Sequence, residues 1–364
     1  MNPRESSKRL VEALSGYLNI LILIKGSPDP DVIASSFALK AVCDHIGIKS
    51  SIIALAEISH PQNRAIVKSL DIPIAIEKTL PPTSAFDAYA VLDFQSARTK
   101  GLSENLPCAV HIDHHAEIED DVSADFRLVS DKAGAASTYM ALILRQLEPP
   151  LPASGMRAVA TALMLGIQTD SDNLRHATRL DYEALQYLGG KADERIVQKV
   201  SNVPLSKDAL RMIGAAMLDH ELYREWLLAG LSFIGESQRD SIAIVADFLL
   251  ENGMARTVVV FAIIEKRRRG GLSLDVSFRT SDPDLDLNSL IKSITPEGGG
   301  RVYKGAYQVG LDYFTACPDR DLLWKMVRLT TIERLKAARD NVRFTELRGF
   351  YRRFRGAMGR LFGG

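Results

Sequence analysis

The feature that most constrains the fold is the apolar run at 18–24, which a Gly-Ser-Pro turn follows closely. Short runs of β-branched and aliphatic residues predict strands that are buried on both faces, as in parallel sheets. The run is too short to cross a bilayer, which takes about 20 residues. Similar strand-like runs follow at 51–55, 88–92 and 108–112.

Helical patterns lie around these strands. The spacing of apolar residues predicts a loop at 25–31 and helices at 6–17, 32–46, 134–147, 154–167 and 180–188. Strands that alternate with helices build a mostly parallel sheet. We therefore expect an N-terminal α/β domain whose sheet is covered by helices on both faces.

A second domain is predicted after Gly189, Gly190 and Lys191, where the helical pattern ends. The chain has 364 residues, which is too long for one small core. Its second half has helical patterns at 206–221 and 239–252, and strand-like runs at 227–233, 257–264 and 272–279. We expect a first domain at 1–190, a linker at 191–205, a smaller α/β domain at 206–320, and a basic helical extension at 321–364.

Composition excludes few classes of protein. Lys+Arg and Asp+Glu number 45 each, so net charge favours neither a nucleic-acid nor a membrane partner. Cys43, Cys108 and Cys317 are odd in number and far apart, which argues against a disulfide framework or a zinc ribbon. The first residues lack the apolar core of a secretory signal. We expect a cytoplasmic protein that is not integral to a membrane.

Acidic and imidazole side chains follow three of the predicted strands and one helix. Asp29 and Asp31 follow the first strand, Asp93 follows the strand at 88–92, and the polar run 113–115 follows the strand at 108–112. Asp170 closes the helical run that ends near 167. Because the carboxyl ends of parallel strands meet at one edge of a sheet, we expect the strand-end side chains to converge there.

Carboxylates that converge in this way repel one another unless a cation neutralises them. The mixture of Asp and His suits Mn²⁺, with Mg²⁺ or Co²⁺ as alternatives, because thiolates are absent from the motifs. Ions of this kind activate water and hold a phosphoryl oxygen, which is the chemistry of phosphoester hydrolysis.

Each patch has a structural alternative when it is taken alone. Asp29 and Asp31 match a helix cap, Asp93 matches an Asx-turn residue, and Asp170 could cap the segment that follows it. The polar run 113–115 is different, because three consecutive polar residues after an apolar strand have no evident structural use. The four patches in this order favour one site over four separate caps.

In these motifs the sequence resembles the DHH phosphoesterases, in the branch with a C-terminal DHH-associated domain. The match consists of Asp113-His114-His115, Pro28-Asp29-Pro30-Asp31 with Ala34-Ser35-Ser36, Leu92-Asp93, the motif at 166–170 with Arg175-His176, and the small-residue run at 134–138. The resemblance covers about residues 12–312. The branch includes nanoribonucleases that also remove phosphate from pAp, and cyclic-dinucleotide phosphodiesterases.

The resemblance implies roles for the residues of the first domain. The metal ligands would be Asp29, Asp31, Asp93, His114 and Asp170. Asp93 and Asp170 would be the ligands shared between ions. His115 would contact the scissile phosphate, and Asp113 would orient the histidines.

The resemblance also implies that the smaller domain binds the substrate, through a Gly-rich loop that ends in His in the family and in Arg here. The corresponding residues are Arg279, Gly298, Gly299, Gly300, Arg301, Tyr303 and Lys304. Backbone N–H groups of such a loop can hold an anion, and Arg301 can bind phosphate. Tyr303 and Lys304 could stack on a base or pair with phosphate. A flexible glycine turn, a packed Tyr and a solvated Lys are the structural alternatives.

Lys25 departs from the family pattern, because it stands where the first motif has a metal-binding His. A protonated lysine cannot ligate a metal. Either one ion is weakly bound or absent, or Lys25 joins Asp113 and His115 in the catalytic set and holds a substrate phosphate.

Together these features predict a metal-dependent phosphoesterase, with one or two Mn²⁺ ions, that acts on small nucleotides or short oligonucleotides as an exonuclease or phosphodiesterase. The substrate would bind between the domains, which would close through the linker at 191–205. Two alternatives remain. One is a catalytically weakened nucleotide-binding relative, because of Lys25. The other is a pyrophosphatase or polyphosphatase.

Two basic segments suggest further contacts. The turn at 266–271 could meet nucleic-acid phosphates, although a solvated turn is the default interpretation. The segment 341–364 has six Arg, one acidic residue and interleaved aromatic residues. It could lie on RNA, on an anionic surface, on the smaller domain or in a homodimer.

Overall fold

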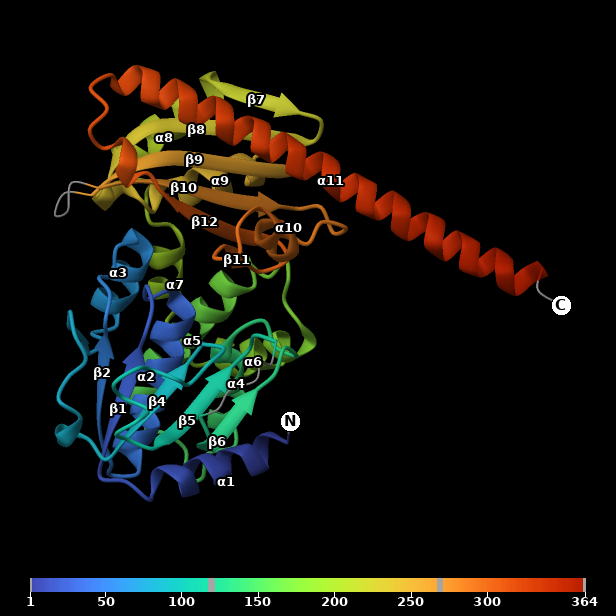
Figure 1. Cartoon of the computed structure of the whole chain (residues 1–364). Helices are drawn as coiled ribbons and strands as arrows, with labels where there is room; N and C mark the ends of the chain where they lie inside the picture. The colour runs from blue at the N-terminus through green and yellow to red at the C-terminus, as the bar shows by residue number, and fades with distance from the viewer. Residues whose placement is uncertain (1, 117–121, 267–270, 363–364) are drawn as a thin grey trace. The chain divides into compact units, whose positions relative to one another are not determined.

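The computed structural model describes residues 2–116, 122–266 and 271–362, with side chains described as far as residue 341. The chain divides into two compact units, Met1–Pro204 and Leu205–Gly364. Each unit has its own sheet and its own hydrophobic core (Figure 1).

The first unit is built on a sheet whose neighbouring strands are all parallel. Its strands are β1 (Asn19–Ile24), β2 (Lys49–Ala54), β3 (Ile74–Ile76), β4 (Ala88–Leu92), β5 (Cys108–Asp113) and β6 (Ala124–Val129). Their order is β3-β2-β1-β4-β5-β6. The direction of the order therefore switches between β1 and β4, where ligands bind in open parallel sheets.

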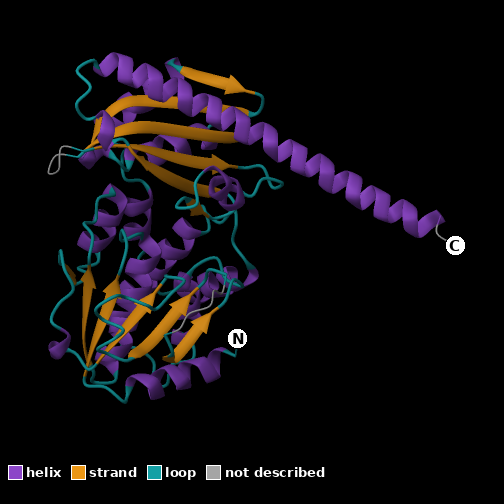
Figure 2. Cartoon of the chain, viewed as in Figure 1, coloured by secondary structure: helices purple, strands orange, loops and turns teal. Residues whose placement is uncertain are grey.

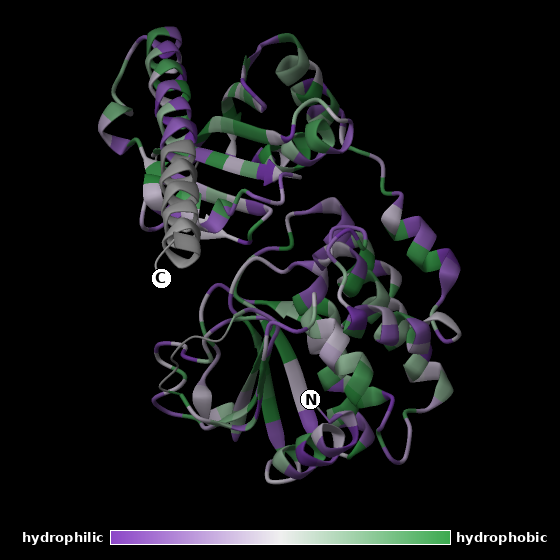
Figure 3. Ribbon diagram, turned by 90° about the vertical axis from the view of Figure 1, so that its right-hand side faces the viewer, coloured by the Kyte–Doolittle hydropathy of each residue, from purple (hydrophilic) through white to green (hydrophobic). Residues whose placement is uncertain are grey.

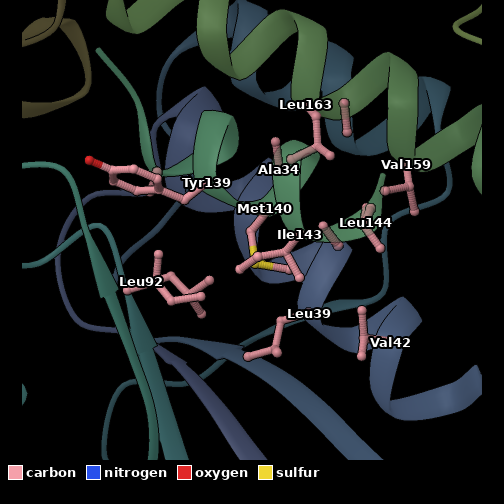
Figure 4. Close-up of a cluster of buried hydrophobic side chains, with 14 of the residues drawn as sticks. Ala34, Leu39, Val42, Leu92, Tyr139, Met140, Ile143, Leu144, Val159 and Leu163 are labelled. Atoms are coloured by element: carbon pink, nitrogen blue, oxygen red, sulfur yellow. The ribbon is translucent and has the colours of Figure 1, made fainter. Parts of the chain in front are cut away.

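Helices cover one face of this sheet and form the main core. They are α1 (Pro3–Leu14), α2 (Pro30–His45), α3 (Pro61–Ser69), α4 (Ala136–Leu144), α5 (Ala153–Asp170), α6 (Arg179–Gly189) and α7 (Glu194–Ser201). Ile20, Ile22 and Ile24 of β1 point into this core. Figure 4 shows side chains of α2, α4 and α5 gathered near Leu92 of β4. The predicted α/β fold with a mostly parallel sheet and helical cover is confirmed.

The opposite face of the sheet is covered differently from the expectation. Leu21 and Leu23 of β1 pack against apolar residues of the two segments that flank β4, 80–87 and 93–106, in which the only helical turn is the short 3-10 helix η1 (Thr83–Ala85). Pro81, Pro82 and Gly101 in these segments oppose a long helix. Irregular chain thus takes the place of the expected helices on this face.

The second unit has a mixed sheet with helices on both faces (Figure 2). Its strands are β7 (His220–Tyr223), β8 (Trp226–Gly235), β9 (Thr257–Glu265), β10 (Leu272–Thr280), β11 (Gly299–Gly300) and β12 (Lys304–Gly310), in the order β11-β12-β10-β9-β8-β7. The β8–β9 pair is parallel and the other pairs are antiparallel. The helices are α8 (Lys207–Leu218), α9 (Ser241–Glu251), α10 (Leu287–Ile294) and α11 (Arg320–Phe362), with 3-10 turns η2 (Glu236–Gln238) and η3 (Asp312–Phe314).

Two cores lie on the two faces of this second sheet. Helices α8 and α9 contribute Ile213 and Val245 to one of them. Helices α10 and α11 contribute Ile291 and Leu335 to the other. Figure 3 shows the hydrophobic residues of each unit concentrated on its strands and on the adjoining helices.

The predicted elements differ from the observed ones at their ends and in several short elements that were not predicted. The strand at 88–92 is reproduced, whereas α2 begins at Pro30 instead of Val32 because Asp29 caps the helix and Pro is favoured in its first turn. The elements that were not predicted include α3, β3 and β6 in the first unit and β7, α10, β11 and β12 in the second. The stretch 191–205, which was expected to be a linker, includes α7, whose Val200 is buried in the first core.

Some expectations concern residues that the structure does not describe. Residues 267–270 of the basic turn and the side chains of 342–364 lie outside the described residues, although the backbone is helical to Phe362. Cys43, Cys108 and Cys317 are free thiols. Across the described parts of the chain, the helices are too short or too polar to span a membrane.

Candidate metal centre

Four side chains meet at the carboxyl edge of the first sheet. Asp93 follows β4, His114 follows β5, Asp31 lies in the first turn of α2 and Asp170 ends α5. One ligand atom of each lies within 4.8 Å of those of the others. His114 Nε2 is 2.9 Å from Asp170 Oδ2, 3.2 Å from Asp93 Oδ1 and 3.9 Å from Asp31 Oδ2. The fold thus brings together side chains that are up to 139 residues apart, as Asp31 and Asp170 are.

Asp93 is held in an unusual backbone conformation at the end of β4. Its φ is 56°, in the left-handed region that Asp tolerates better than most residues. The Asp93 N–H donates to the Ile112 carbonyl at 2.9 Å, which joins the end of β4 to β5. Strained backbone of this kind at a buried acidic residue is frequent at functional sites.

Asp31 is fully buried and caps a helix other than its own. Its carboxylate accepts N–H groups from the start of α4, at 2.6 Å from Ala136 and 2.8 Å from Ser137. These N–H groups have no partner within their helix and carry the positive end of its dipole. Each carboxylate oxygen keeps a second lone pair, so this capping is compatible with binding a cation.

Asp29 acts as the cap of α2 itself. Its Oδ1 accepts the N–H groups of Asp31 and Val32, both at 3.0 Å. Asp29 therefore has the helix-capping role that was one of the two interpretations of its sequence motif. This residue is not part of the four-residue cluster, although its charge raises the pKa of Asp93.

Asp170 lies at the C-terminal end of α5, where the helix dipole disfavours a negative charge. It is nevertheless buried, with 3% of its surface exposed. Gly166, one turn earlier, allows α5 to approach the start of α2. A Cβ at this position would lie 3.2 Å from both Asp31 Cα and the Pro30 carbonyl oxygen, and would collide with Ser137 Oγ. The close crossing of α2 and α5 therefore requires glycine.

Asp113 holds the second histidine. His115 Nδ1 lies 2.8 Å from Asp113 Oδ1, which also accepts the His114 N–H at 2.9 Å. Burial opposes ionisation of Asp113, but the hydrogen bond and charge of His115 outweigh it and lower the pKa of Asp113. An ionised Asp113 favours a protonated Nδ1 on His115. The ligand atoms of Asp93, Asp113, His114 and His115 form a second group that lies within the same 4.8 Å limit.

The cluster is electrostatically unfavourable as a set of carboxylates. Burial and the charge of Asp93 raise the pKa of Asp31 well above its ordinary value. Burial and the charge of Asp29 raise the pKa of Asp93 to about 7. Burial disfavours a charged His114, yet hydrogen bonding to Asp170 and Asp93 raises the pKa of His114 well above its ordinary value.

The donor atoms of the cluster fit a divalent cation. Three carboxylates and one imidazole nitrogen form an oxygen-rich set that suits Mn²⁺ or Mg²⁺ better than a thiolate-seeking metal. Asp93 Oδ1 and Asp113 Oδ2 are buried oxygens that accept no well-directed hydrogen bond within the described chain. Buried carboxylate oxygens without such bonds are costly unless an ion satisfies them.

Lys25 makes contacts outside this cluster. Its Nζ donates to the carbonyl oxygens of Ser96 at 2.7 Å and Arg98 at 2.8 Å, and it lies 5.5 Å from the centre of the Phe94 ring. Lys25 therefore stabilises the loop that follows Asp93 through two hydrogen bonds.

A buried residue that sequence reasoning missed, Asp181, explains the small-residue run at 134–138. It accepts the Gly134 N–H at 3.0 Å and the Thr138 hydroxyl at 2.5 Å. It also forms the capping box of α6 with Thr178. The run is therefore held at one end by Asp181 and at its centre by Asp31. The Thr-x-x-Asp spacing was the only sequence signal for this role.

In the second unit, the predicted substrate residues lie around the β10–β12 pair. Arg279 is the Cα partner of Lys304 in that pair, and its guanidinium forms an ion pair with Asp247 of α9. Gly300 pairs with Gly305, and Arg301 Nη1 lies 3.4 Å from the Tyr303 hydroxyl. A Cβ at Gly298 would lie 2.6 Å from Ile291 and 2.7 Å from Tyr307, so this glycine is required by packing.

No protein-family model matches this chain. An uncharacterized protein of Methanocaldococcus jannaschii is 30% identical over 311 residues, which are 85% of this chain. The chain spans 61% of the length of that curated relative.

Two solved structures match the chain over most of its length. An exopolyphosphatase-related protein from Bacteroides fragilis has a TM-score of 0.65 at 16% identity, covering 92% of this chain and 98% of that one. RecJ from Thermus thermophilus, in complex with Mn²⁺, has a TM-score of 0.49 at 14% identity, covering 92% of this chain and 54% of that one. The likeness to the Bacteroides fragilis protein extends over both units.

Proposed function

We propose that this chain is a DHH-family phosphoesterase, which uses divalent cations to hydrolyse phosphate esters of small nucleotides or short oligonucleotides. The observation that carries this proposal is the buried cluster of Asp31, Asp93, His114 and Asp170 at the switch point of a parallel sheet. A purely structural cluster of three carboxylates and one imidazole would be repulsive. A cation site explains why they are gathered.

The roles of the residues follow from their contacts. Asp31, Asp93, His114 and Asp170 would hold the cation, which when bound supplies Lewis-acid activation of water and of a phosphoryl oxygen. The side chain of His115 is 29% exposed and therefore more accessible than that of His114 at 5%. We assign to His115 the contact with the scissile phosphate, oriented through Asp113.

In the second unit, we assign phosphate binding to the Gly298, Gly299 and Gly300 loop with Arg301, Tyr303 and Lys304. Arg279 and Lys304 face each other across the β10–β12 pair. Asp247 of α9 forms an ion pair with the Arg279 guanidinium, so Arg279 supports the strand pair. Lys304 follows the loop directly, where an ammonium group can contribute to the binding of a phosphate.

The proposal is tested by a substrate panel assayed with Mn²⁺, and separately with Mg²⁺ and Co²⁺. The panel contains pAp, short RNA, cyclic dinucleotides, pyrophosphate and polyphosphate. We expect turnover of a nucleotide substrate that Asp93→Asn abolishes. The matched control is Asp44→Asn, an exposed acidic residue at the far end of α2, which should act like wild type. Hydrolysis that survives Asp93→Asn would refute the site, and turnover of pyrophosphate or polyphosphate alone would refute the substrate class.

A nucleotide-binding relative with little activity is the second candidate, and the contacts of Lys25 favour it. Lys25 stands where the family has a metal-binding His, and its Nζ donates to the Ser96 and Arg98 carbonyl oxygens, so the site has one metal ligand fewer than the family pattern. Tight nucleotide binding without hydrolysis in all three metals would establish this candidate. Two Mn²⁺ ions per chain together with turnover would exclude it.

A further inference from the structure

The second unit contains a cavity that the proposed phosphoesterase does not use. It has a volume of about 400 Å³ and lies between the sheet and the first half of α11. Such a volume lies within the range of small-molecule sites. Most of its lining is apolar and includes Leu274 and Val309 from the sheet, Ile294 from α10, and Leu323 and Val327 from α11.

Two hydroxyl side chains line this cavity. Tyr307 is 7% exposed and Thr331 is 4% exposed. Neither side chain makes a hydrogen bond within the described residues, and neither hydroxyl oxygen is among the fully buried unpartnered polar atoms there. Both hydroxyls can therefore hydrogen-bond to a polar group of a molecule in the cavity.

A positive charge stands at the same end of the cavity. Arg334 lies one helical turn after Thr331 on α11, lines the cavity, and has no acidic partner among the described residues. Burial raises the pKa of Tyr307 to about 12, and the positive charge of Arg334 partly opposes this shift. The cavity thus combines an apolar body with one cation and two hydroxyl donors at one end.

We propose that this cavity binds a small amphipathic carboxylate, with its aliphatic chain against the sheet and α11 and its carboxylate on Arg334, Tyr307 and Thr331. The apolar lining selects an aliphatic body over a sugar or a nucleotide. A single guanidinium with two neutral donors matches one carboxylate, because Arg binds such groups through paired N–H donors. The cavity shares no residue with the metal cluster, so this binding site and the proposed function can be tested separately.

The test is calorimetric titration of the full chain with decanoate, below its micellar concentration, and with decanol as the uncharged probe. We expect saturable binding of one decanoate per chain, with decanol bound about tenfold more weakly. Arg334→Gln should weaken decanoate binding about tenfold and leave decanol unaffected. Tyr307→Phe, which preserves packing, should weaken decanoate binding by a smaller factor.

Lys325→Gln is the matched control, because it removes an exposed charge from the same helix and does not line the cavity. It should bind decanoate like wild type. Val327→Phe, which fills the cavity, should abolish binding of both probes, and far-UV circular dichroism checks that each variant is folded. Equal binding of decanoate and decanol, equal effects of Arg334→Gln and Lys325→Gln, or no saturable binding would each overturn the proposal.

Discussion

At the scale of single residues, Asp93 combines features that a structural residue would not need. It has a left-handed backbone conformation, and burial together with the charge of neighbouring carboxylates raises its pKa to about 7. Asn has nearly the same shape and also tolerates a positive φ. Replacing Asp93 by Asn therefore separates the charge from the fold.

We expect Asp93→Asn to lower kcat/KM by at least about 100-fold in Mn²⁺, because a ligand charge is lost. Without metal, its free energy of unfolding should equal or exceed that of wild type, because one repulsive carboxylate is removed. Steady-state kinetics and denaturant unfolding in EDTA measure the two effects. A variant that is both active and less stable would show that Asp93 has a structural role instead.

Lys25 gives a second prediction at this scale. Lys25→Met removes the two hydrogen bonds to the Ser96 and Arg98 carbonyls, so we expect a loss of stability of about 1–2 kcal/mol. Amide hydrogen exchange should accelerate in the 94–99 loop. Lys25→His should behave similarly, because an imidazole cannot reach both carbonyl oxygens. If Lys25→His instead gains Mn²⁺ affinity and rate, the missing ligand is limiting and the loop contact is dispensable.

Residues at strand ends were predictable, and partners distant in sequence were not. Asp93 and His114 could be placed at the site because parallel strands deliver their carboxyl ends to one edge. The contact of Asp31 with the start of α4 joins residues 105 apart, and no local pattern indicates it. The role of Asp181 was not predicted for the same reason, because Gly134, which donates a hydrogen bond to it, is 47 residues away.

At the scale of elements, the approach of α5 to α2 decides the shape of the metal centre. Gly166→Ala should force these helices apart, because the added methyl group meets the backbone of Pro30 and Asp31 and the Ser137 hydroxyl. We expect destabilisation of about 1–3 kcal/mol and weaker Mn²⁺ binding.

Gly155→Ala is the matched control for this prediction. Gly155 belongs to the same helix, and a Cβ there would meet no atom within 4 Å. This variant should gain about 0.5–1 kcal/mol from helix propensity. Chemical denaturation of both variants measures the contrast. Equal effects would mean that the α2–α5 crossing is not tight.

Element prediction was accurate where periodicity was strong. The buried strand at 88–92 and the main helices were recovered because their apolar patterns are regular. The irregular cover formed by 80–87 and 93–106 was not predicted, because its buried residues, such as Leu102, have no fixed spacing. Irregular segments bury side chains through tertiary contacts that a local pattern does not encode.

At the scale of the whole molecule, each unit has its own core, and the stability of the first unit should respond to alkaline pH through Cys43. Burial raises the pKa of the Cys43 thiol from 9.0 to about 12. Between these values the unfolded chain loses the thiol proton while the folded chain keeps it. The free energy of unfolding should therefore fall by about 1.4 kcal/mol per pH unit above pH 9.

Cys43→Ala removes this contribution and should show a shallower loss of stability between pH 9 and pH 11. Cys317→Ala is the control, since Cys317 is only half-buried. Because other groups also titrate in this range, the comparison rests on the difference between variants. Parallel slopes for wild type and Cys43→Ala would contradict the prediction.

The central claim is that Asp31, Asp93, His114 and Asp170 hold a divalent cation. Anomalous diffraction at the manganese edge, from crystals of the full chain grown with Mn²⁺, tests it directly. We predict an anomalous peak bounded by these four side chains, with His114 Nε2 turned from Asp170 to the ion. A cluster that keeps its present contacts and shows no peak, while Mn²⁺ binds elsewhere, would contradict the account.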